Sequence, residues 1–312
     1  MDEYKVALAK ISSASKLETK KKEPYVQGNL STIEGTSVTF KIWNDNRPLD
    51  FLKDFEEGSK YFKIQYQEDA FNNTSYFTIK SFLKMTTDEV NNSFLKKSLE
   101  KQKNLLDRLD KIIETNLSEK GKSFIKEYSS SNKEIWDRFL LEYAAKGMHD
   151  ASPVGLLNHT VKMLEVLELS MKQHDYYGLN EDGKDLIFLG LLLHDIGKVK
   201  EYNEGTPTHL SKVTHRGLGI EITVLNKELY LKYYPEDFYY ETIAIINQHH
   251  GMFEERPHSI FSYYVHLVDM FDTHTTALYE NIIKNKDLDT IRVIDRDIPI
   301  LYKNKVYFKD EK

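Results

Sequence analysis

The hydrophobic pattern of the sequence changes near residue 85. Before this point, short segments alternate between apolar and polar residues and are rich in β-branched and aromatic side chains, as half-buried β-strands are. Beyond it, apolar residues recur at the spacing of amphipathic helices. The pattern therefore predicts an α+β protein of several domains, with a small β-domain followed by an all-α domain.

Three strands are expected in the β-domain, at Ser37–Trp43, Tyr61–Tyr66 and Tyr76–Phe82. Clusters of turn-forming residues at 44–48, 56–59 and 72–75 separate them. Several short strands in so small a segment suit a closed or nearly closed barrel, and an OB-like barrel is the first choice.

Aromatic side chains in these strands have two possible roles. They could stack on unpaired bases, or they could fill the barrel core. Trp43 is the one taken as a substrate-binding residue. The aromatic residues concerned are Trp43, Tyr61, Tyr66, Tyr76 and Phe77.

After residue 85, the hydrophobic pattern predicts helices at Val90–Thr115, Lys122–Tyr128 and Glu134–Lys146, with a loop at Ser129–Asn132. Strand character returns in the tail, at residues 290–294 and 305–308. The predicted domains are a nucleic-acid-binding barrel at 1–86, a helical linker at 87–146, an all-α domain at 147–285 and a tail at 286–312.

Composition excludes several classes of protein. The chain has no cysteine, which rules out disulfides, zinc–thiolate sites and thiol nucleophiles. It has no run of about 18 apolar residues that would span a membrane. Its N-terminus lacks the apolar core of a secretory signal. We therefore expect a cytoplasmic protein without a membrane partner.

The net charge of −6 argues against a broadly basic surface. A nucleic-acid ligand would need local basic patches. Two lysine clusters are candidates, although solvated surface is the simpler interpretation of both. They lie at Lys20–Lys22 and at Lys96, Lys97, Lys101 and Lys103.

Histidines and aspartates gather at the ends of apolar helical segments. Burying such groups is costly unless they are paired or bound to a metal ion. One histidine on an apolar face is usually a core residue, but a coincidence does not account for the whole set. Its members are His159, His194, Asp195, His249, His250 and Asp269.

Imidazole nitrogens and carboxylate oxygens without thiolates suit manganese, iron or another first-row divalent ion. The adjacent pair His194-Asp195 could give one metal a nitrogen while its carboxylate reaches a second metal. Two metals about 3.5–4 Å apart can hold a bridging hydroxide and clamp a phosphoryl group.

The segment Leu193-His-Asp-Ile-Gly-Lys198, with Gly155-Leu-Leu-Asn-His159 upstream and Asp269 downstream, resembles the signature of the HD superfamily of phosphohydrolases. That superfamily has an all-α fold. The resemblance implies one metal held by His159, His194, Asp195 and Asp269. It implies a second held by His215, His249 and His250, with Asp195 bridging. His209 is the rival of His215, and Asp272 is expected behind the ligands.

The whole layout is similar to YhaM-type 3′→5′ exoribonucleases, which combine an OB-fold with an HD domain. The likeness also includes Lys41-Ile-Trp-Asn44, His149, Gln248-His-His-Gly251 and Val268-Asp-Met-Phe-Asp272. It implies a metal-dependent 3′→5′ exonuclease acting on single-stranded RNA, or on single-stranded DNA. Two divalent ions are implied, Mn²⁺ first, with iron or Co²⁺ as alternatives. The many tyrosines and phenylalanines permit a homo-oligomer.

The expected mechanism is attack of a metal-bridging hydroxide on the phosphorus of the terminal phosphodiester. Asp195 and Lys198 are the candidate catalytic residues. Lys198 would contact a phosphate, or would be a helix C-terminal lysine that matches the helix dipole. Arg216 would contact substrate phosphate, or would pair with a surface acid. His149 would approach the substrate from the loop before Gly155.

Three alternatives remain open. The first is an HD-type phosphohydrolase or phosphodiesterase of a small nucleotide or a cyclic (di)nucleotide, because fold does not determine substrate. The second is a nucleic-acid-binding module with an inactive HD domain, against which the intact set of seven ligands argues. The third is a di-iron oxygenase on the same helical fold, which would require iron specifically.

Overall fold

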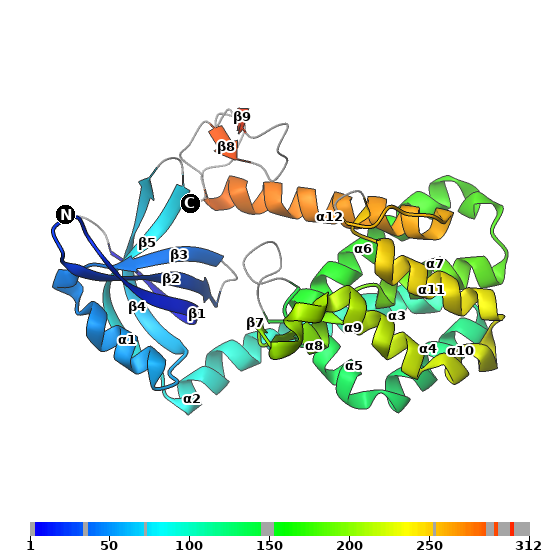
Figure 1. The fold of residues 1–312 in the computed structure, drawn as a ribbon, viewed down its shortest axis with the longest axis horizontal. Helices are drawn as coiled ribbons and strands as arrows, with labels where there is room; N and C mark the ends of the chain where they lie inside the picture. Colours follow the sequence, from blue (N-terminus) through cyan, green and yellow to red (C-terminus); the bar gives the residue numbers. More distant parts are fainter. Residues whose placement is uncertain are drawn as a thin grey trace. The chain divides into compact units, whose positions relative to one another are not determined.

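The computed structural model describes residues 4–33, 37–71, 74–144, 153–251, 254–284, 290–292 and 300–302. The chain divides into two compact units. One consists of Met1–Leu99 with Thr276–Lys312, and the other of Glu100–Thr275. The fold is α+β, with an N-terminal barrel followed by a helical domain, as predicted (Figure 1).

Five strands close the barrel in the order β1-β2-β3-β5-β4, and β4 pairs back with β1. Only the pairing of β3 with β5 is parallel among these strands. This arrangement is consistent with the OB-like fold predicted. The strands are β1 (Lys5–Glu18), β2 (Pro24–Thr32), β3 (Ser37–Ile42), β4 (Tyr61–Phe71) and β5 (Thr74–Lys84).

A short helix that the sequence did not predict packs on the barrel core. Helix α1 (Pro48–Glu56) follows the one-turn helix η1 (Asn44–Asn46) and begins with Pro48, whose fixed φ suits a first helical position. Its Phe51 is fully buried, with ring centroids 5.4 Å from Phe40 and 4.8 Å from Phe62. The helix therefore completes the barrel interior.

Two of the aromatic residues considered for base stacking belong to the core. Tyr66 and Phe77 are buried and stack on each other, with centroids 3.9 Å apart. A stacking role for these two is therefore wrong. Tyr61 is half-buried and packs on Phe94 with centroids 5.0 Å apart.

Trp43 and Tyr76 are half-buried at the barrel surface, where they share a lysine. The ammonium group of Lys41 lies 4.2 Å from the Tyr76 ring centroid and 5.5 Å from the Trp43 ring. Tyr25 packs beside Trp43 with centroids 5.0 Å apart. We call Tyr25, Lys41, Trp43 and Tyr76 the barrel aromatic cluster.

The helices predicted between residues 90 and 146 are present, but they begin and end at other residues than predicted. The segment 90–115 lies within a continuous run of α2 (Thr87–Val90), a π-helical turn η2 (Asn91–Leu95) and α3 (Lys96–Asn116). The loop expected at 129–132 is mostly helix, because α4 (Glu119–Ser131) continues through the serines. The hydroxyls of Ser129 and Ser130 donate back to carbonyls three residues earlier.

The helix expected at 134–146 ends at Phe139, and its predicted continuation through residues 140–144 is wrong. Helix α5 (Lys133–Phe139) ends there, and residues 145 and 146 lie outside the described part of the chain. Near its end, Arg138 donates to the carbonyl of Tyr202 at 2.5 Å. After α5, the carbonyls of Leu141 and Glu142 accept from the amides of Val154 and Leu156, so this backbone bonds to a distant segment and not to a further helical turn.

The remaining helices build the second unit and lead out of it. They are α6 (Gly155–Gln173), η3 (Asp175–Gly178), α7 (Glu181–Leu193), α8 (Lys198–Glu201), η4 (His209–Val213), α9 (Thr214–Leu225), α10 (Lys227–Tyr233), α11 (Glu236–Gln248) and α12 (Ile260–Lys284). A two-stranded hairpin, β6 (Tyr202–Asn203) and β7 (Thr206–Pro207), follows α8. In the tail, β8 (Thr290–Arg292) pairs with β9 (Ile300–Tyr302), whereas the predicted strand at 305–308 lies outside the described residues.

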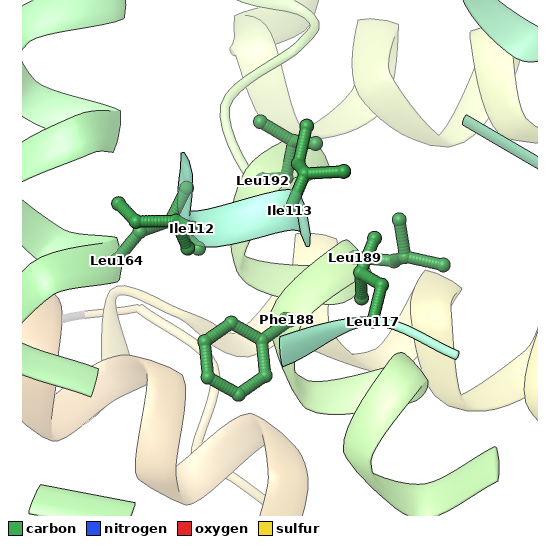
Figure 2. Close-up of a pocket in the computed structure, with 7 residues that line it drawn as sticks. All are labelled: Ile112, Ile113, Leu117, Leu164, Phe188, Leu189 and Leu192. Atoms are coloured by element: carbon green, nitrogen blue, oxygen red, sulfur yellow. The ribbon is translucent and has the colours of Figure 1, made fainter. Parts of the chain in front are cut away.

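Helix α7 is the centre of the second unit. Its residues from Asp185 to Leu193 are all buried, and it packs against α6 and α11. A gap of about 10 Å³ beside it is lined only by apolar side chains, among them Ile112, Leu164 and Phe188 (Figure 2). Because no polar side chain lines this gap, it is part of the core packing and is unsuited to bind a phosphate. The tight packing fixes the residues at the C-terminal end of α7.

None of the described helices is long and apolar enough to cross a membrane.

Candidate metal centre

The structure brings together all seven side chains that the sequence singled out as metal ligands. His159 lies in the second turn of α6, and His215 is the second residue of α9. The pairs His194-Asp195 and His249-His250 directly follow α7 and α11, and Asp269 lies within α12.

The first group of ligands consists of His159, His194, Asp195 and Asp269. The Nε2 atom of His159 is 3.3 Å from Asp269 Oδ1 and 3.8 Å from Asp195 Oδ2. His194 Nε2 lies 3.3 Å from the same Asp195 oxygen. One ligand atom from each of His159, His194 and Asp195 lies within 4.8 Å of the other two, as a common metal ion requires.

The second group consists of His215, His249 and His250, again within 4.8 Å of one another. The Nε2 atoms of His215 and His250 are 3.3 Å apart. Asp195 Oδ1 is 3.5 Å from Nε2 of His215 and of His249. Asp195 therefore directs one carboxylate oxygen toward each group.

All five histidines direct Nε2 toward the centre because Nδ1 is held by another group. For His194 and His249 the partner is a backbone carbonyl, which only accepts, so Nδ1 donates and Nε2 keeps its lone pair. Such outer partners commonly orient the ligands of metal sites. The Nδ1 contacts are His159 to Asp272 (2.7 Å), His194 to the Leu191 carbonyl (2.6 Å), His215 to Glu201 (2.9 Å), His249 to the Ile246 carbonyl (2.9 Å) and His250 to Glu254 (3.3 Å).

These residues fit a divalent metal ion. His194 Nε2, His249 Nε2 and Asp195 Oδ1 are buried and have no hydrogen-bond partner among the described residues. Buried acceptor atoms of this kind are costly unless a donor or a cation meets them. Because the donors are nitrogen and carboxylate oxygen, ions such as Mn²⁺, Fe²⁺ and Co²⁺ suit the site.

Three of the histidines have shifted pKa values, His249 and His250 downward and His159 upward. Burial lowers the pKa of His249 to about 3 and also lowers that of His250, so both are neutral at pH 7. Burial also disfavours the charged form of His159, but Asp269 and Asp272 outweigh it and raise the pKa of His159 to about 9. His159 therefore carries an extra proton at pH 7.

An ion that binds His159 must displace this proton. We expect the apparent affinity of the first group to rise about tenfold per pH unit from pH 7 and to level off above pH 9. Calorimetric titration with Mn²⁺ in buffers of different ionisation enthalpy would measure the proton released. A pH-independent affinity with no proton release would contradict this prediction.

Lys198 is the first residue of α8, and its ammonium group lies 2.6 Å from Asp195 Oδ2. Burial disfavours its charge, but Asp195 outweighs this effect and raises the pKa of Lys198. The lysine therefore lies beside the carboxylates as a cation, five residues beyond the end of α7.

Arg216 pairs with Glu254 and donates to the carbonyl of Asn247 at 2.9 Å. Of the two roles that the sequence left open for Arg216, the structure shows the pairing with an acidic residue. A contact of Arg216 with substrate phosphate stays a prediction. His209 is exposed on η4, whereas His215 is in the cluster. His149 lies outside the described residues, and Trp43 belongs to the barrel unit.

Sequence reasoning assigned no role to several residues that orient the ligands. Glu201 and Glu254 hold His215 and His250. His266 donates from Nδ1 to the His249 carbonyl at 2.8 Å, because a carbonyl oxygen only accepts. Gly251 has φ +59°, and a Cβ there would lie 2.2 Å from the His266 ring. A glycine directly after a histidine pair was the one signal of this close approach.

Comparisons with known proteins agree with this geometry. Residues 157–285 match the family model "HD domain", and the segment contains all seven candidate ligands. A curated relative from Methanocaldococcus jannaschii, dihydroneopterin 2′,3′-cyclic phosphate phosphodiesterase, is 29% identical over 151 residues. The match covers 47% of this chain and 57% of the relative, so the chain spans little more than half of that protein. No solved structure matched the chain.

Proposed function

Because residues 157–285 form an HD domain, we propose that this protein is a metal-dependent phosphodiesterase that uses two divalent ions. The observation that carries the proposal is the convergence of four histidine Nε2 atoms on Asp195, which directs one oxygen toward each ligand group.

His159, His194 and Asp269 would hold one ion and His215, His249 and His250 the other, with Asp195 shared. Two such ions, when bound, lower the pKa of a water molecule and stabilise charge on phosphoryl oxygens. Lys198, whose ammonium group lies 2.6 Å from Asp195 Oδ2, would pair with a phosphoryl oxygen of the substrate. Asp272 fixes the ring of His159, and Glu201 that of His215.

A small cyclic phosphodiester is the first candidate substrate. The relative that supports it hydrolyses a cyclic phosphate, and its match spans about the length of the helical domain. In this case the reaction would need only the HD domain.

Single-stranded RNA, degraded from its 3′ end, is the second candidate. The barrel aromatic cluster supports it, because half-buried aromatic rings beside a lysine suit stacking on unpaired bases. Single-stranded DNA would fit the same surface.

The test uses the full chain loaded with Mn²⁺ and three substrates: a 2′,3′-cyclic nucleotide, a cyclic dinucleotide and 5′-labelled single-stranded RNA. We expect hydrolysis of at least one phosphodiester. If RNA is the substrate, Trp43→Ala should lower RNA hydrolysis about 5- to 100-fold through lost stacking and leave a cyclic nucleotide unaffected. Tyr4→Ala, at an exposed tyrosine of the same unit, is the matched control. Protein with two bound equivalents of Mn²⁺ that hydrolyses none of the three would overturn the proposal.

A further inference from the structure

Glu142 is a buried carboxylate that plays no part in the site described above. Its side chain is 5% exposed and accepts hydrogen bonds from the backbone amides of Tyr143 (3.1 Å), Glu204 (3.2 Å) and Gly205 (2.9 Å). Arg138 lies 3.3 Å away. Burying a carboxylate is costly unless its oxygens are satisfied, and here both of them are.

The backbone of Glu142 is joined to the start of α6, the helix that carries His159. The Leu156 amide donates to the Glu142 carbonyl at 3.0 Å, and the Val154 amide donates to the Leu141 carbonyl at 2.9 Å. Val154 has φ +64°, a left-handed conformation that is rare for a β-branched residue. Such a conformation persists only where surrounding contacts hold it.

The side chain of Glu142 holds the turn between β6 and β7. Gly205 has φ +74°, and a Cβ there would lie 2.6 Å from the Tyr143 ring, so the turn packs closely against the segment that carries Glu142. Arg138 holds the same hairpin through the Tyr202 carbonyl. We call Arg138 and Glu142 the hairpin clamp.

The clamped hairpin leads from Glu201 to His215. The Thr208 amide donates to the Glu201 carbonyl at 2.8 Å and closes the hairpin onto α8. The Glu201 carboxylate then accepts from both the backbone amide (3.1 Å) and Nδ1 (2.9 Å) of His215. Thr214, directly before His215, has φ +64° and ψ 157°, a region that is essentially restricted to glycine. The His215 ring therefore depends on contacts imposed from outside α9.

We propose that Glu142 is a positioning residue for the second group of metal ligands. By holding the turn at Glu204 and Gly205, it fixes Glu201, and Glu201 aims the Nε2 atom of His215 at the site shared with His249 and His250. This inference rests on the proposed metal centre and adds to it a residue that touches neither metal nor substrate.

A purely structural role for Glu142 would lower stability and leave the relative affinities of the two ions unchanged. A positioning role weakens one ion selectively. The test is calorimetric titration of the metal-free full chain with Mn²⁺, for wild type, Glu142→Gln and Glu142→Ala. We expect two ions in wild type, and a second ion bound about 10- to 100-fold more weakly in Glu142→Ala, with the first ion unchanged. Glu142→Gln, which keeps one acceptor oxygen, should lie between them.

Two further variants keep the inference testable if Glu142→Ala does not fold. Glu201→Gln acts directly on His215 and should weaken the same ion. Glu127→Gln is the matched control, because Glu127 accepts from Lys232 (2.6 Å) and Tyr233 (2.7 Å) in the same unit but on its surface, and it should bind both ions as wild type does.

Wild-type affinity for both ions in Glu142→Gln and Glu201→Gln would overturn the inference, as would equal weakening of the two ions or a wild-type protein that binds only one. The titration needs no substrate. A protein that binds two ions, loses one selectively in these variants and hydrolyses no phosphodiester would refute the proposed function while supporting the role of Glu142.

Discussion

Replacing Asp195 by alanine should lower phosphodiester hydrolysis by about 10²- to 10³-fold, the scale of losing one preorganised electrostatic group in an active site. Asp195 is the only described residue whose carboxylate faces both ligand groups, at 3.3 Å from His194 and 3.5 Å from His215 and His249. Its loss should therefore affect both ions, whereas loss of a single histidine should affect mainly one.

The measurement is the initial rate at saturating Mn²⁺, together with the metal content of the purified variant. Lys198 loses its 2.6 Å partner in Asp195→Ala, so thermal unfolding should be recorded to separate misfolding from lost catalysis. Asp182→Asn is a suitable control, because Asp182 pairs with Lys120 on the surface of the same unit. More than a tenth of the wild-type rate in a folded Asp195→Ala would exclude a shared carboxylate at the centre.

Six of the seven candidate ligands could be found from the sequence because they lie in or at the ends of apolar helical segments, whereas His215 was given only by the resemblance to the HD superfamily. His194-Asp195 and His249-His250 directly follow buried helical segments, and polar groups in such positions need a compensating partner. The residues behind the ligands could not be found in this way. Glu201 is 14 positions from His215, and Glu142 is more than 60 positions from the amides of Glu204 and Gly205 that it binds, so their roles depend on chain folding.

In the barrel too, some elements could be predicted from local sequence and others depend on chain folding. Strands β3, β4 and β5 were predicted because they are dense in β-branched and aromatic residues. Strand β1 was missed because its second half, Ser12–Lys16, consists of small and polar residues with low strand propensity. Its pairing with β2 and β4 supplies the stabilisation that its own residues do not predict.

Arg216 illustrates what a motif alone cannot decide. A basic residue beside a candidate ligand fits phosphate binding and surface ion pairing equally well. The structure pairs it with Glu254, which also lies 3.3 Å from His250. The same carboxylate therefore contacts both residues. A loss of activity in Arg216→Ala could then come from a changed orientation of His250 as well as from a lost contact with substrate.

Metal removal should lower the thermal stability of the protein more than any single surface substitution. The centre contains the buried Nε2 atoms of His194 and His249, which have no hydrogen-bond partner among the described residues. It also contains two carboxylates, Asp195 and Asp269, whose pKa values lie below the usual range despite burial, chiefly through Lys198 for the first and His159 for the second. An ion at one hundred times its dissociation constant adds about 2.7 kcal/mol to the free energy of unfolding. For a unit the size of Glu100–Thr275, this corresponds to a rise in Tm of about 5–10 °C per ion.

Differential scanning calorimetry of the chelated protein, with and without Mn²⁺, measures this shift. His249→Ala should keep roughly half of it, because the first ligand group stays intact. Mg²⁺ at the same concentration should give a much smaller shift, since it prefers an octahedron of oxygen ligands and five of the seven candidate ligands are imidazoles. An equal shift with Mg²⁺ would mean that the carboxylates alone hold the ion. The histidines would then be buried structural groups, and the Nε2 atoms of His194 and His249, which have no hydrogen-bond partner among the described residues, argue against that role.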